Sequence, residues 1–308
     1  MKVFIDGSAG TTGLRIHERL ADRKDIELLI LPDDIRKEPA ARKEAINSAD
    51  IAFLCLPDAA AKEAVAMIEG DTAVIDTSTA HRVNPEWAYG FPELPGLRSK
   101  IAASRRIANP GCHASGFIAL VAPLVHAGIL PKQAELTCFS LTGYSGGGKK
   151  MIAEYEEDGR NSLLDAPRQY GISQTHKHLP EMAVVCGLDK PPVFCPIVAP
   201  FYSGMEVTVP LFASQLCGTV ADVKEVYRSL YTTPLVHFDE NADEGGFFSA
   251  GALSGFDDMQ VSVAGNDERI ILTSRFDNLG KGASGAAIQN MNIIMGVDET
   301  EGLVLSYK

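Results

Sequence analysis

The sequence predicts an α/β protein in two parts, a doubly wound parallel sheet at the N-terminus followed by an α+β domain. Three observations support this prediction. Over roughly the first hundred residues, short apolar strand segments alternate with helical patterns. A glycine-rich turn joins the first strand to the first helix. From about residue 130 the strand segments lengthen and loops separate them, which is typical of a largely antiparallel sheet.

The composition narrows the range of possible functions. With 308 residues, of which 45% are hydrophobic and 22% charged, the chain can fold into two ordinary globular domains. A net charge of -12 argues against nucleic acid or an anionic membrane as a partner. No apolar run reaches the ~18 residues of a membrane span, and the N-terminus has no signal-peptide layout, so we expect a cytoplasmic protein. The six cysteines lie singly, which predicts neither a disulfide framework nor a metal site.

The first strand, 2–6, leads into a turn that carries Gly7, Gly10 and Gly13, and a helical pattern follows. Strand, glycine turn and helix are the layout that binds a dinucleotide, because the backbone can approach a pyrophosphate and the helix N-terminus donates N–H groups to it. The spacing departs from the common G-x-G-x-x-G, so a plain tight turn is the alternative. The turn residues expected to contact the cofactor are Gly7, Gly10, Thr11, Thr12 and Gly13.

The second strand, 26–31, precedes the position where an NAD-specific protein carries an acidic residue for the ribose hydroxyls. Asp33 and Asp34 follow it here, but so do Arg36 and Lys37, which are suited to a 2′-phosphate. This pattern favours NADP over NAD, and a solvated charged loop is the alternative.

Strands three and four are predicted at 49–56 and 72–76, with a fifth at 101–108. In a doubly wound sheet the carboxyl ends of the strands face the ligand crevice. We therefore expect the cofactor to contact Leu56 and Pro57 after the third strand and Ser78 after the fourth. Arg82, a little further on, is a candidate anion clamp or else a member of a surface ion pair.

Cys112 follows the turn Asn109-Pro110-Gly111, and apolar residues then recur at helical spacing. Cys112 is therefore expected in the first turn of a helix, where free N–H groups and the helix dipole favour a thiolate over a thiol. This makes Cys112 the candidate nucleophile. The other cysteines, Cys55, Cys138, Cys186, Cys195 and Cys217, are interpreted as small buried thiols.

The stretch His176-Lys177-His178-Leu179-Pro180-Glu181 is the second candidate for chemistry. Pro180 is suited to the first position of a helix, so His178 should lie just outside a helix N-terminus, where the dipole keeps the ring neutral. If 176–178 is extended, the two rings point to opposite faces, and only one reaches Cys112. We choose His178, oriented by Glu181, and keep His176 as a substrate contact or the alternative base. His113 is a rival base because it follows Cys112 directly, but neighbouring residues on a helix point about a quarter-turn apart, so it is interpreted as a polar residue near a helix start.

The second half of the chain is expected to contain strands at 135–141, 193–198, 205–211 and 270–274. The stretch 143–150 reads as a flexible loop with two cations, which is either a hinge or a ligand contact. Residues 277–291 read as a glycine-broken loop and a helix of small residues that returns to the first domain. The predicted domains are 1–112, completed by about 280–308, and 113–279.

Three motifs together are similar to those of the N-acetyl-gamma-glutamyl-phosphate reductases in their short bacterial form. They are Asn109-Pro110-Gly111-Cys112, the histidine stretch 176–181 and the stretch 277–285. The resemblance runs over nearly the whole chain. It implies a Rossmann-type domain, a substrate domain of the semialdehyde dehydrogenase type, a place in arginine biosynthesis and a homo-oligomer, either a dimer or a tetramer. The chain departs from the longer family form at Thr11 and at His113-Ala114-Ser115, which leaves adenine and substrate packing open.

The resemblance also implies residue roles. Cys112 matches the family's nucleophile, and the histidine motif supplies the acid and base through His178 or His176, with Glu181. Arg82 matches the arginine expected near the substrate phosphate. The full set of candidates adds Asn109, Ser145 and Lys149 for the substrate and Asn278 and Gly282 for the cofactor, with no metal.

The implied reaction is NADPH-dependent reductive dephosphorylation of N-acetyl-glutamyl 5-phosphate to the semialdehyde, through a thioester on Cys112, with release of inorganic phosphate. Three alternatives remain open. An enzyme similar to aspartate-semialdehyde dehydrogenase would use the same chemistry on a shorter chain. A cysteine hydrolase would use Cys112, His178 and Glu181 but not the glycine turn. A non-enzymatic NADP-binding redox sensor would keep the nucleotide fold without turning over an aldehyde.

Overall fold

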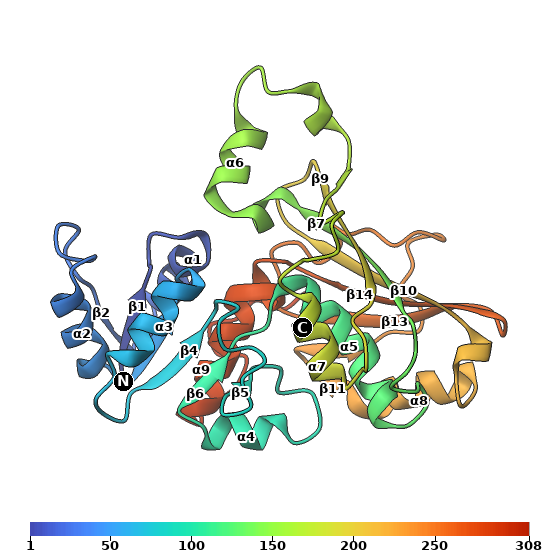
Figure 1. The fold of residues 1–308 in the computed structure, drawn as a ribbon, viewed down its shortest axis with the longest axis horizontal. Helices are drawn as coiled ribbons and strands as arrows, with labels where there is room; N and C mark the ends of the chain where they lie inside the picture. Colours follow the sequence, from blue (N-terminus) through green and yellow to red (C-terminus); the bar gives the residue numbers. More distant parts are fainter. Residues whose placement is uncertain (308) are drawn as a thin grey trace. The chain divides into compact units, whose positions relative to one another are not determined.

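The computed structural model describes residues 1–307, and the chain forms two compact units (Figure 1). The first unit consists of Met1–Pro110 and Ala283–Leu303. The second consists of Gly111–Gly282 together with the last residues of the chain. The second unit is therefore inserted into the sequence of the first, which recovers its final segment only after residue 282.

The first unit is built on a parallel sheet of six strands in the order β2-β1-β3-β4-β6-β5. From β1 the sheet continues in both directions, to β2 on one side and to β3 and β4 on the other, as in a doubly wound nucleotide-binding fold. The strands are β1 (Lys2–Asp6), β2 (Glu27–Leu29), β3 (Ile51–Leu54), β4 (Ala73–Asp76), β5 (Ala88–Tyr89) and β6 (Arg106–Ala108). The helices are α1 (Thr11–Leu20), α2 (Pro39–Ser48), α3 (Asp58–Ala66), α4 (Leu97–Ala103) and α9 (Gly285–Met295).

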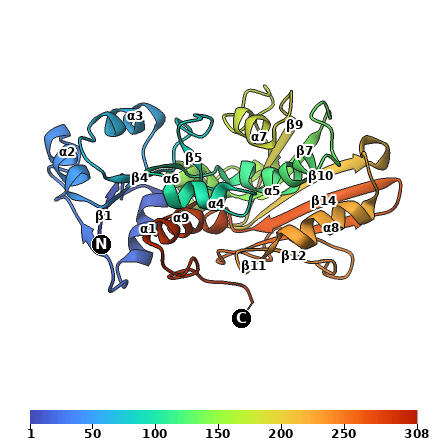
Figure 2. The same ribbon diagram turned by 90° about the horizontal axis from the view of Figure 1, so that it is seen from below.

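Helices cover both faces of this sheet, since alternate residues of each strand point to opposite sides. Val3 packs in one core with Ile16 of α1 and Ile288 of α9. Phe4, its neighbour in β1, packs in the other core with Ile46 of α2. Figure 2 shows α2 and α3 on one side of the sheet and α1 and α9 on the other.

The predicted strand at 101–108 was wrong over its first half. Residues 97–103 form α4, and only Arg106–Ala108 form a strand. Ile101 is fully buried against the sheet core from the helix. A single buried apolar residue at this point fits a helix as well as a strand, so the apolar pattern could not separate the two.

The second unit is built on a mixed sheet of eight strands in the order β11-β12-β13-β14-β10-β7-β9-β8. Neighbouring strands are antiparallel except for the parallel pairs β7–β9 and β12–β13. The strands are β7 (Thr137–Gly143), β8 (Arg168–Gln169), β9 (Val193–Ala199), β10 (Met205–Phe212), β11 (Thr232–Thr233), β12 (Val236–Phe238), β13 (Met259–Gly265) and β14 (Arg269–Phe276). The helices are α5 (Cys112–His126), α6 (Gly148–Glu156), α7 (Leu179–Cys186) and α8 (Val220–Leu230), and shorter helical turns lie at Tyr144–Gly147, Ser162–Asp165, Ala213–Gln215 and Gly280–Ser284.

Helix α5 lies directly on this sheet, and Gly116 allows the close approach. A Cβ at Gly116 would lie 2.4 Å from Val207 Cγ2 of β10 and 2.7 Å from Ser274 Oγ of β14. The helix is almost entirely buried, which explains why its apolar residues surround it rather than forming one stripe. The α5 N-terminus, which carries Cys112, is thus fixed on a rigid core.

Two further predictions need correction. The stretch 143–150 is a helical turn at Tyr144–Gly147 followed by the start of α6, so Lys149 and Lys150 are helical and exposed rather than in an open loop. Residues 304–307 belong to the second unit, not the first. The reason is local: Asp257 accepts a hydrogen bond from Val304 N, and Asp258 accepts one from Ser306 N.

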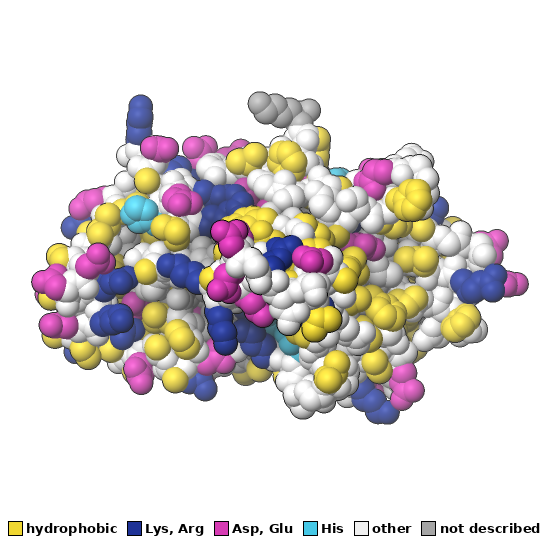
Figure 3. Space-filling view, turned by 90° about the horizontal axis from the view of Figure 1, so that it is seen from above, with side chains coloured by type: hydrophobic (Ala, Val, Ile, Leu, Met, Phe, Trp, Pro, Cys, Tyr) yellow, Lys and Arg dark blue, Asp and Glu magenta, His cyan; other side chains and the backbone are white. Residues whose placement is uncertain are grey.

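The surface carries charges of both signs. On the face drawn in Figure 3, acidic and basic side chains are interspersed, with hydrophobic side chains gathered in patches between them. Within residues 1–307, no helix has both the length and the apolar character needed to cross a membrane.

Candidate active site

Cys112 is the first residue of α5, as the sequence predicts, and its side chain is partly exposed. Gly111 is the N-cap in an extended conformation, with φ -81° and ψ 145°. The first N–H groups of a helix have no partner within the helix, so they are available to a charge at this end. Gly282 brings a second stretch of backbone against the cysteine, since a Cβ there would lie 3.0 Å from Cys112 Cβ.

Glu181 contacts this helix start directly. Its Oε1 accepts a hydrogen bond of 2.9 Å from the N–H of Gly111, and its side chain is 1% exposed. Glu181 lies in the first turn of α7, so a carboxylate from one helix holds the residue that precedes Cys112. The prediction gave Glu181 the role of orienting His178, and the observed contact adds a role in anchoring the cysteine turn.

The histidine stretch is a turn rather than an extended segment, so the prediction that the two rings point to opposite faces was wrong. His178 is the N-cap of α7 with helical angles, φ -85° and ψ -12°. Its backbone N–H donates to Nδ1 of His176 at 3.2 Å, and the two ring centroids lie 4.7 Å apart. Both histidines therefore face the same region.

His113 completes this group, and the sequence did not reveal its position. Its ring centroid lies 5.7 Å from that of His178 and 5.8 Å from that of His176. His113 is 3% exposed, and its two ring nitrogens contact Ser140 Oγ at 2.7 Å and Tyr170 Oη at 2.6 Å. Its place directly after Cys112 is the one sequence signal that points to it.

Burial sets the protonation of these rings. Desolvation, with a smaller contribution from His176, lowers the pKa of His113 to about 3. Desolvation and the charge of Lys177 lower the pKa of His176. Both rings are therefore neutral at pH 7, and a neutral imidazole can accept a proton. Elsewhere burial raises the pKa of Cys55 to about 12, which fits its interpretation as an inert thiol.

The first unit contains a cavity of about 640 Å³ at the carboxyl ends of β1 and β3. Of the predicted cofactor residues, Gly7, Gly10, Leu56 and Pro57 line it, and so do Arg36 and Lys37. Thr11 and Thr12 open α1, whose N-cap is Gly10. Arg42, which the sequence analysis did not single out, also lines the cavity and forms a bidentate ion pair with buried Asp6, the shorter contact being 2.8 Å.

The turn at this cavity requires glycine. Gly7 has φ +86°, and a Cβ there would lie 2.3 Å from the carbonyl oxygen of Cys55 in the segment after β3. At Gly13 a Cβ would lie 2.4 Å from the carbonyl oxygen of Gly7. Since the backbone comes this close at both positions, the strand, turn and helix form the tight cradle that a pyrophosphate needs.

Replacing Gly7 with alanine should lower the free energy of unfolding by about 2 kcal/mol or more, because the new methyl group clashes with backbone and the residue must keep a left-handed φ. Chemical denaturation followed by circular dichroism measures this change. Gly70→Ala is the matched control, since nothing lies within 4 Å of its Cβ position. Equal stabilities of the two variants would contradict the expected clash.

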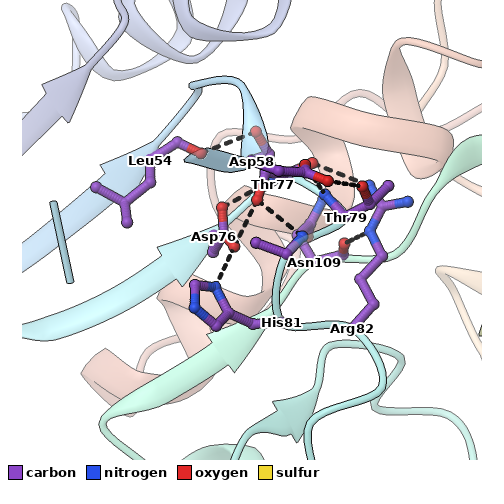
Figure 4. Close-up of polar contacts among 10 residues, drawn as sticks. Leu54, Asp58, Asp76, Thr77, Thr79, His81, Arg82 and Asn109 are labelled. Carbon is purple, nitrogen blue, oxygen red and sulfur yellow. Dashed lines mark hydrogen bonds and ion pairs between the residues drawn. The ribbon is translucent and has the colours of Figure 1, made fainter. Parts of the chain in front are cut away.

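Hydrogen bonds also connect the residues that follow the carboxyl end of β4 (Figure 4). Buried Asp76 accepts hydrogen bonds from Ser78 N and Oγ and contacts His81 Nδ1 at 2.6 Å. Arg82 donates to the carbonyl oxygens of Asn109 and Thr77, each at 2.9 Å. The guanidinium of Arg82 is thus held in place by backbone, whereas the Ser78 hydroxyl is occupied by Asp76.

Other predicted site residues make structural contacts. Asn109 donates to the carbonyl of Ala283 at 3.0 Å and accepts from Asn290 at 3.2 Å. In the second unit, Asn278 donates to Ser145 Oγ at 3.0 Å and accepts from Gly204 N at 2.9 Å. Asn278 and Gly282 therefore belong to the unit that carries Cys112, and Asn278 fixes Ser145.

Known proteins share both the sequence and the fold. A family model described as "Semialdehyde dehydrogenase, dimerisation domain" matches residues 112–278, and one described as "Semialdehyde dehydrogenase, NAD binding domain" matches residues 32–103. Proteins from Brucella ovis and Brucella canis named N-acetyl-gamma-glutamyl-phosphate reductase are 46% identical over 307 residues, covering 96% of this chain and 99% of each relative. The chain belongs to the N-acetyl-gamma-glutamyl-phosphate reductase family.

Solved structures of aspartate semialdehyde dehydrogenases have a similar fold. Aspartate semialdehyde dehydrogenase II from Vibrio cholerae, complexed with ASA, has a TM-score of 0.72 at 18% identity and covers 96% of this chain and 98% of its own. The Candida albicans aspartate semialdehyde dehydrogenase with NADP has a TM-score of 0.64 at 16% identity, with coverages of 96% and 98%. The predicted fold class and the predicted family are both confirmed.

Proposed function

We propose that this protein reduces N-acetyl-glutamyl 5-phosphate to N-acetyl-glutamate 5-semialdehyde, with NADPH as the reductant, as a step of arginine biosynthesis. The observation that carries the proposal is a partly exposed cysteine at the start of a buried helix, followed directly by His113, whose ring lies beside those of His176 and His178, in a chain 46% identical to named reductases. This arrangement suits an acyl transfer to sulfur rather than a metal-assisted reaction.

Cys112 is the nucleophile in this proposal. Its sulfur attacks the acyl phosphate carbonyl, the carbon–oxygen bond to phosphate breaks, and a thioester remains on Cys112. The N–H groups at the α5 N-terminus stabilise the negative charge that develops on the carbonyl oxygen. After reduction of the thioester, the carbon–sulfur bond breaks, the semialdehyde leaves, and the thiolate is regenerated.

His178 is the proposed acid and base, and His176 is the alternative. Both rings lie beside His113, the residue after Cys112. An imidazole in this position can take up a proton while the thioester forms. It can return that proton to the thiohemiacetal oxygen, which is negatively charged after hydride transfer. Arg82 and Lys149 remain the proposed contacts for the phosphate, and the fixed guanidinium of Arg82 suits that role.

The residues of the first unit fit a dinucleotide. Gly7 and Gly13 allow a close backbone approach, and the α1 N-terminus at Gly10 supplies N–H donors. When bound, the reduced nicotinamide supplies the hydride for the thioester carbonyl. The cavity for the dinucleotide is lined by Gly7, Gly10, Leu56 and Pro57. Positive charge at its β2 side comes from Arg36 and Lys37.

Replacing both Arg36 and Lys37 with alanine should weaken NADPH binding about 10- to 100-fold and leave NADH binding nearly unchanged. Each cation can form a charge-assisted hydrogen bond with a 2′-phosphate, which NADH lacks. Dissociation constants from the fluorescence of the reduced cofactors measure both affinities. Lys24→Ala, at an exposed lysine that does not line the cavity, is the matched control. An equal loss for the two cofactors would rule out 2′-phosphate recognition here.

The reaction itself is best tested in the direction of aldehyde oxidation. Purified protein is mixed with NADP, inorganic phosphate and either N-acetyl-glutamate semialdehyde or aspartate semialdehyde, and reduced cofactor is followed by absorbance. The proposal expects a phosphate-dependent signal with the acetylated aldehyde alone. A signal with aspartate semialdehyde alone supports the aspartate-semialdehyde alternative. Cofactor binding without a signal from either aldehyde supports a regulator, and a signal that does not need phosphate contradicts the acyl phosphate reaction.

We also propose that the protein acts in the cytoplasm as a homo-oligomer, a dimer or tetramer, without nucleic acid or membrane as partner. The net charge of -12 is unfavourable for either of those partners. The family model over 112–278 is that of a dimerisation domain. One face of the large sheet carries the exposed apolar side chains Phe139, Val193, Phe212 and Ile271, which suits contact with a second copy.

A further inference from the structure

A buried carboxylate organises the loop after β4, and the proposed function does not use it. Asp76 is 0% exposed. Its carboxylate accepts hydrogen bonds from Ser78 N at 2.9 Å and Ser78 Oγ at 2.8 Å, and it contacts His81 Nδ1 at 2.6 Å. Within residues 1–307, it forms no ion pair with a lysine or an arginine. Because a buried carboxylate is costly without such partners, the path of the loop is the one that satisfies Asp76.

The same loop is closed by Arg82. Its Nη2 donates to the carbonyl oxygen of Thr77 and its Nε to that of Asn109, each at 2.9 Å (Figure 4). Both acceptors are tied to Asp76, because Thr77 is its neighbour in sequence and Asn109 N donates to the Asp76 carbonyl oxygen at 2.8 Å. The position of the guanidinium therefore depends on the backbone around Asp76 and on the path of the chain over 77–82.

His81 is held both at its edge and on its face. The edge contacts Asp76, and the face stacks on the indole of Trp87, with ring centroids 4.0 Å apart and an interplanar angle of 8°. Trp87 is itself buried, in the core that α2 and α3 cover. The loop is thus anchored to the core of the first unit at His81, the residue directly before Arg82.

We propose that Asp76 and His81 are positioning residues for phosphate: their contact holds the loop 77–82 so that Arg82 presents its guanidinium in one fixed place. This inference rests on the proposed function, in which Arg82 contacts the phosphate of the substrate or, in the reverse direction, inorganic phosphate. Asp76 and His81 do not touch the phosphate in this scheme and transfer no proton to it. A guanidinium that is already ordered loses less conformational freedom on binding an anion, so the contact acts on the affinity for phosphate.

Two substitutions separate the edge of His81 from its face. His81→Phe keeps an aromatic ring for Trp87 but removes the nitrogen that contacts Asp76, whereas His81→Asn removes the ring but keeps an N–H at the position of Nδ1. In aldehyde oxidation with NADP, His81→Phe should raise KM for inorganic phosphate about 10-fold and leave kcat within about 2-fold of wild type. His81→Asn should keep this KM within about 2-fold of wild type. Equal increases in the two variants would overturn the inference, because the contact with Asp76 would then not matter.

A double-mutant cycle tests whether His81 acts through Arg82, since effects that pass through one residue do not add. Arg82→Ala should raise KM for phosphate more than His81→Phe does, and adding His81→Phe to it should change KM by less than about 2-fold. A further 10-fold or so increase in the double variant would overturn the inference. An unchanged KM in Arg82→Ala would remove Arg82 from the proposed function, and this inference with it. His126→Phe, at an exposed histidine, is the control and should match wild type.

A second variant serves if circular dichroism shows that His81→Phe folds poorly. His81→Gln is polar, but its amide lies one bond further out and loses the contact with Asp76, so the same rise in KM is expected.

A readout without turnover comes from Trp87, which is the only tryptophan of the chain and stacks on His81. Inorganic phosphate should change its fluorescence, with a midpoint about 10-fold higher in His81→Phe or His81→Gln than in wild type. Equal midpoints in the folded variants would overturn the inference. If aldehyde oxidation by the wild-type protein still depends on phosphate in that case, the proposed function stands alone.

Discussion

Replacing Cys112 with serine is expected to reduce phosphate-dependent aldehyde oxidation by at least ~10⁴-fold, and replacing it with alanine should abolish the reaction. The helix N-terminus that favours a thiolate cannot ionise an alcohol to a useful extent, and the oxygen ester of serine accepts a hydride less readily than a thioester. Initial rates of NADPH formation measure the loss, and fluorescence titration shows whether cofactor affinity is retained.

Cys217→Ser is the control for the Cys112 variants, since Cys217 is also in the second unit and is exposed. This variant should keep the wild-type rate. Cys138 and Cys186 are poor controls because both are buried in the core, where desolvation raises the pKa of each thiol. If Cys112→Ser retained a tenth of the wild-type rate, the covalent route would be excluded.

His178→Ala is expected to lower the turnover rate by about 10²- to 10⁴-fold without abolishing it, which is the usual contribution of a general acid and base. His176→Ala is the matched variant, because the two rings lie 4.7 Å apart beside the same His113 ring. Steady-state kinetics of both variants decides which ring transfers the proton. If His178 has this role, His176→Ala changes KM more than the turnover rate.

The pH profile tests the alternative in which His176 is the base. Burial lowers the pKa of His176, so this ring binds its proton only at a pH below its usual range. If His176 were the base, activity would persist as the pH falls through 6.5, the ordinary value for histidine, and would be lost only below it. A small effect of His178→Ala combined with a large effect of His176→Ala would reverse the assignment.

The alternation of strands and helices in the first half of the chain and the place of Cys112 could be predicted because both depend on local sequence. Turn residues before Cys112 and apolar spacing after it mark a helix start in any context. The segments 97–103 and 148–156 were not recognised as helices, since neither carries a long periodic apolar pattern. In both cases contacts made elsewhere in the fold decided the local structure.

The histidine and tyrosine positions depend on contacts distant in sequence. His176 and His178 face the same region because the backbone turns at 177–178, which the sequence does not dictate. Tyr170 contacts His113, which lies 57 residues earlier in the sequence. The contact depends on the pairing of β8 with β9 at the edge of the large sheet. No local pattern encodes that register, so the contacts of His113 with Ser140 and Tyr170 could be found only in the folded chain.

The interrupted first unit has a consequence for synthesis on the ribosome. Helix α9 supplies Ala287, Ile288 and Met291 to one core of the first sheet, yet these residues are translated only after the whole segment 111–282. At about 5–20 residues per second, the nascent N-terminal segment waits roughly ten to forty seconds for its missing helix. During that interval α1 alone covers one apolar side of the sheet, so the core of the first unit is completed only after the inserted segment has been made.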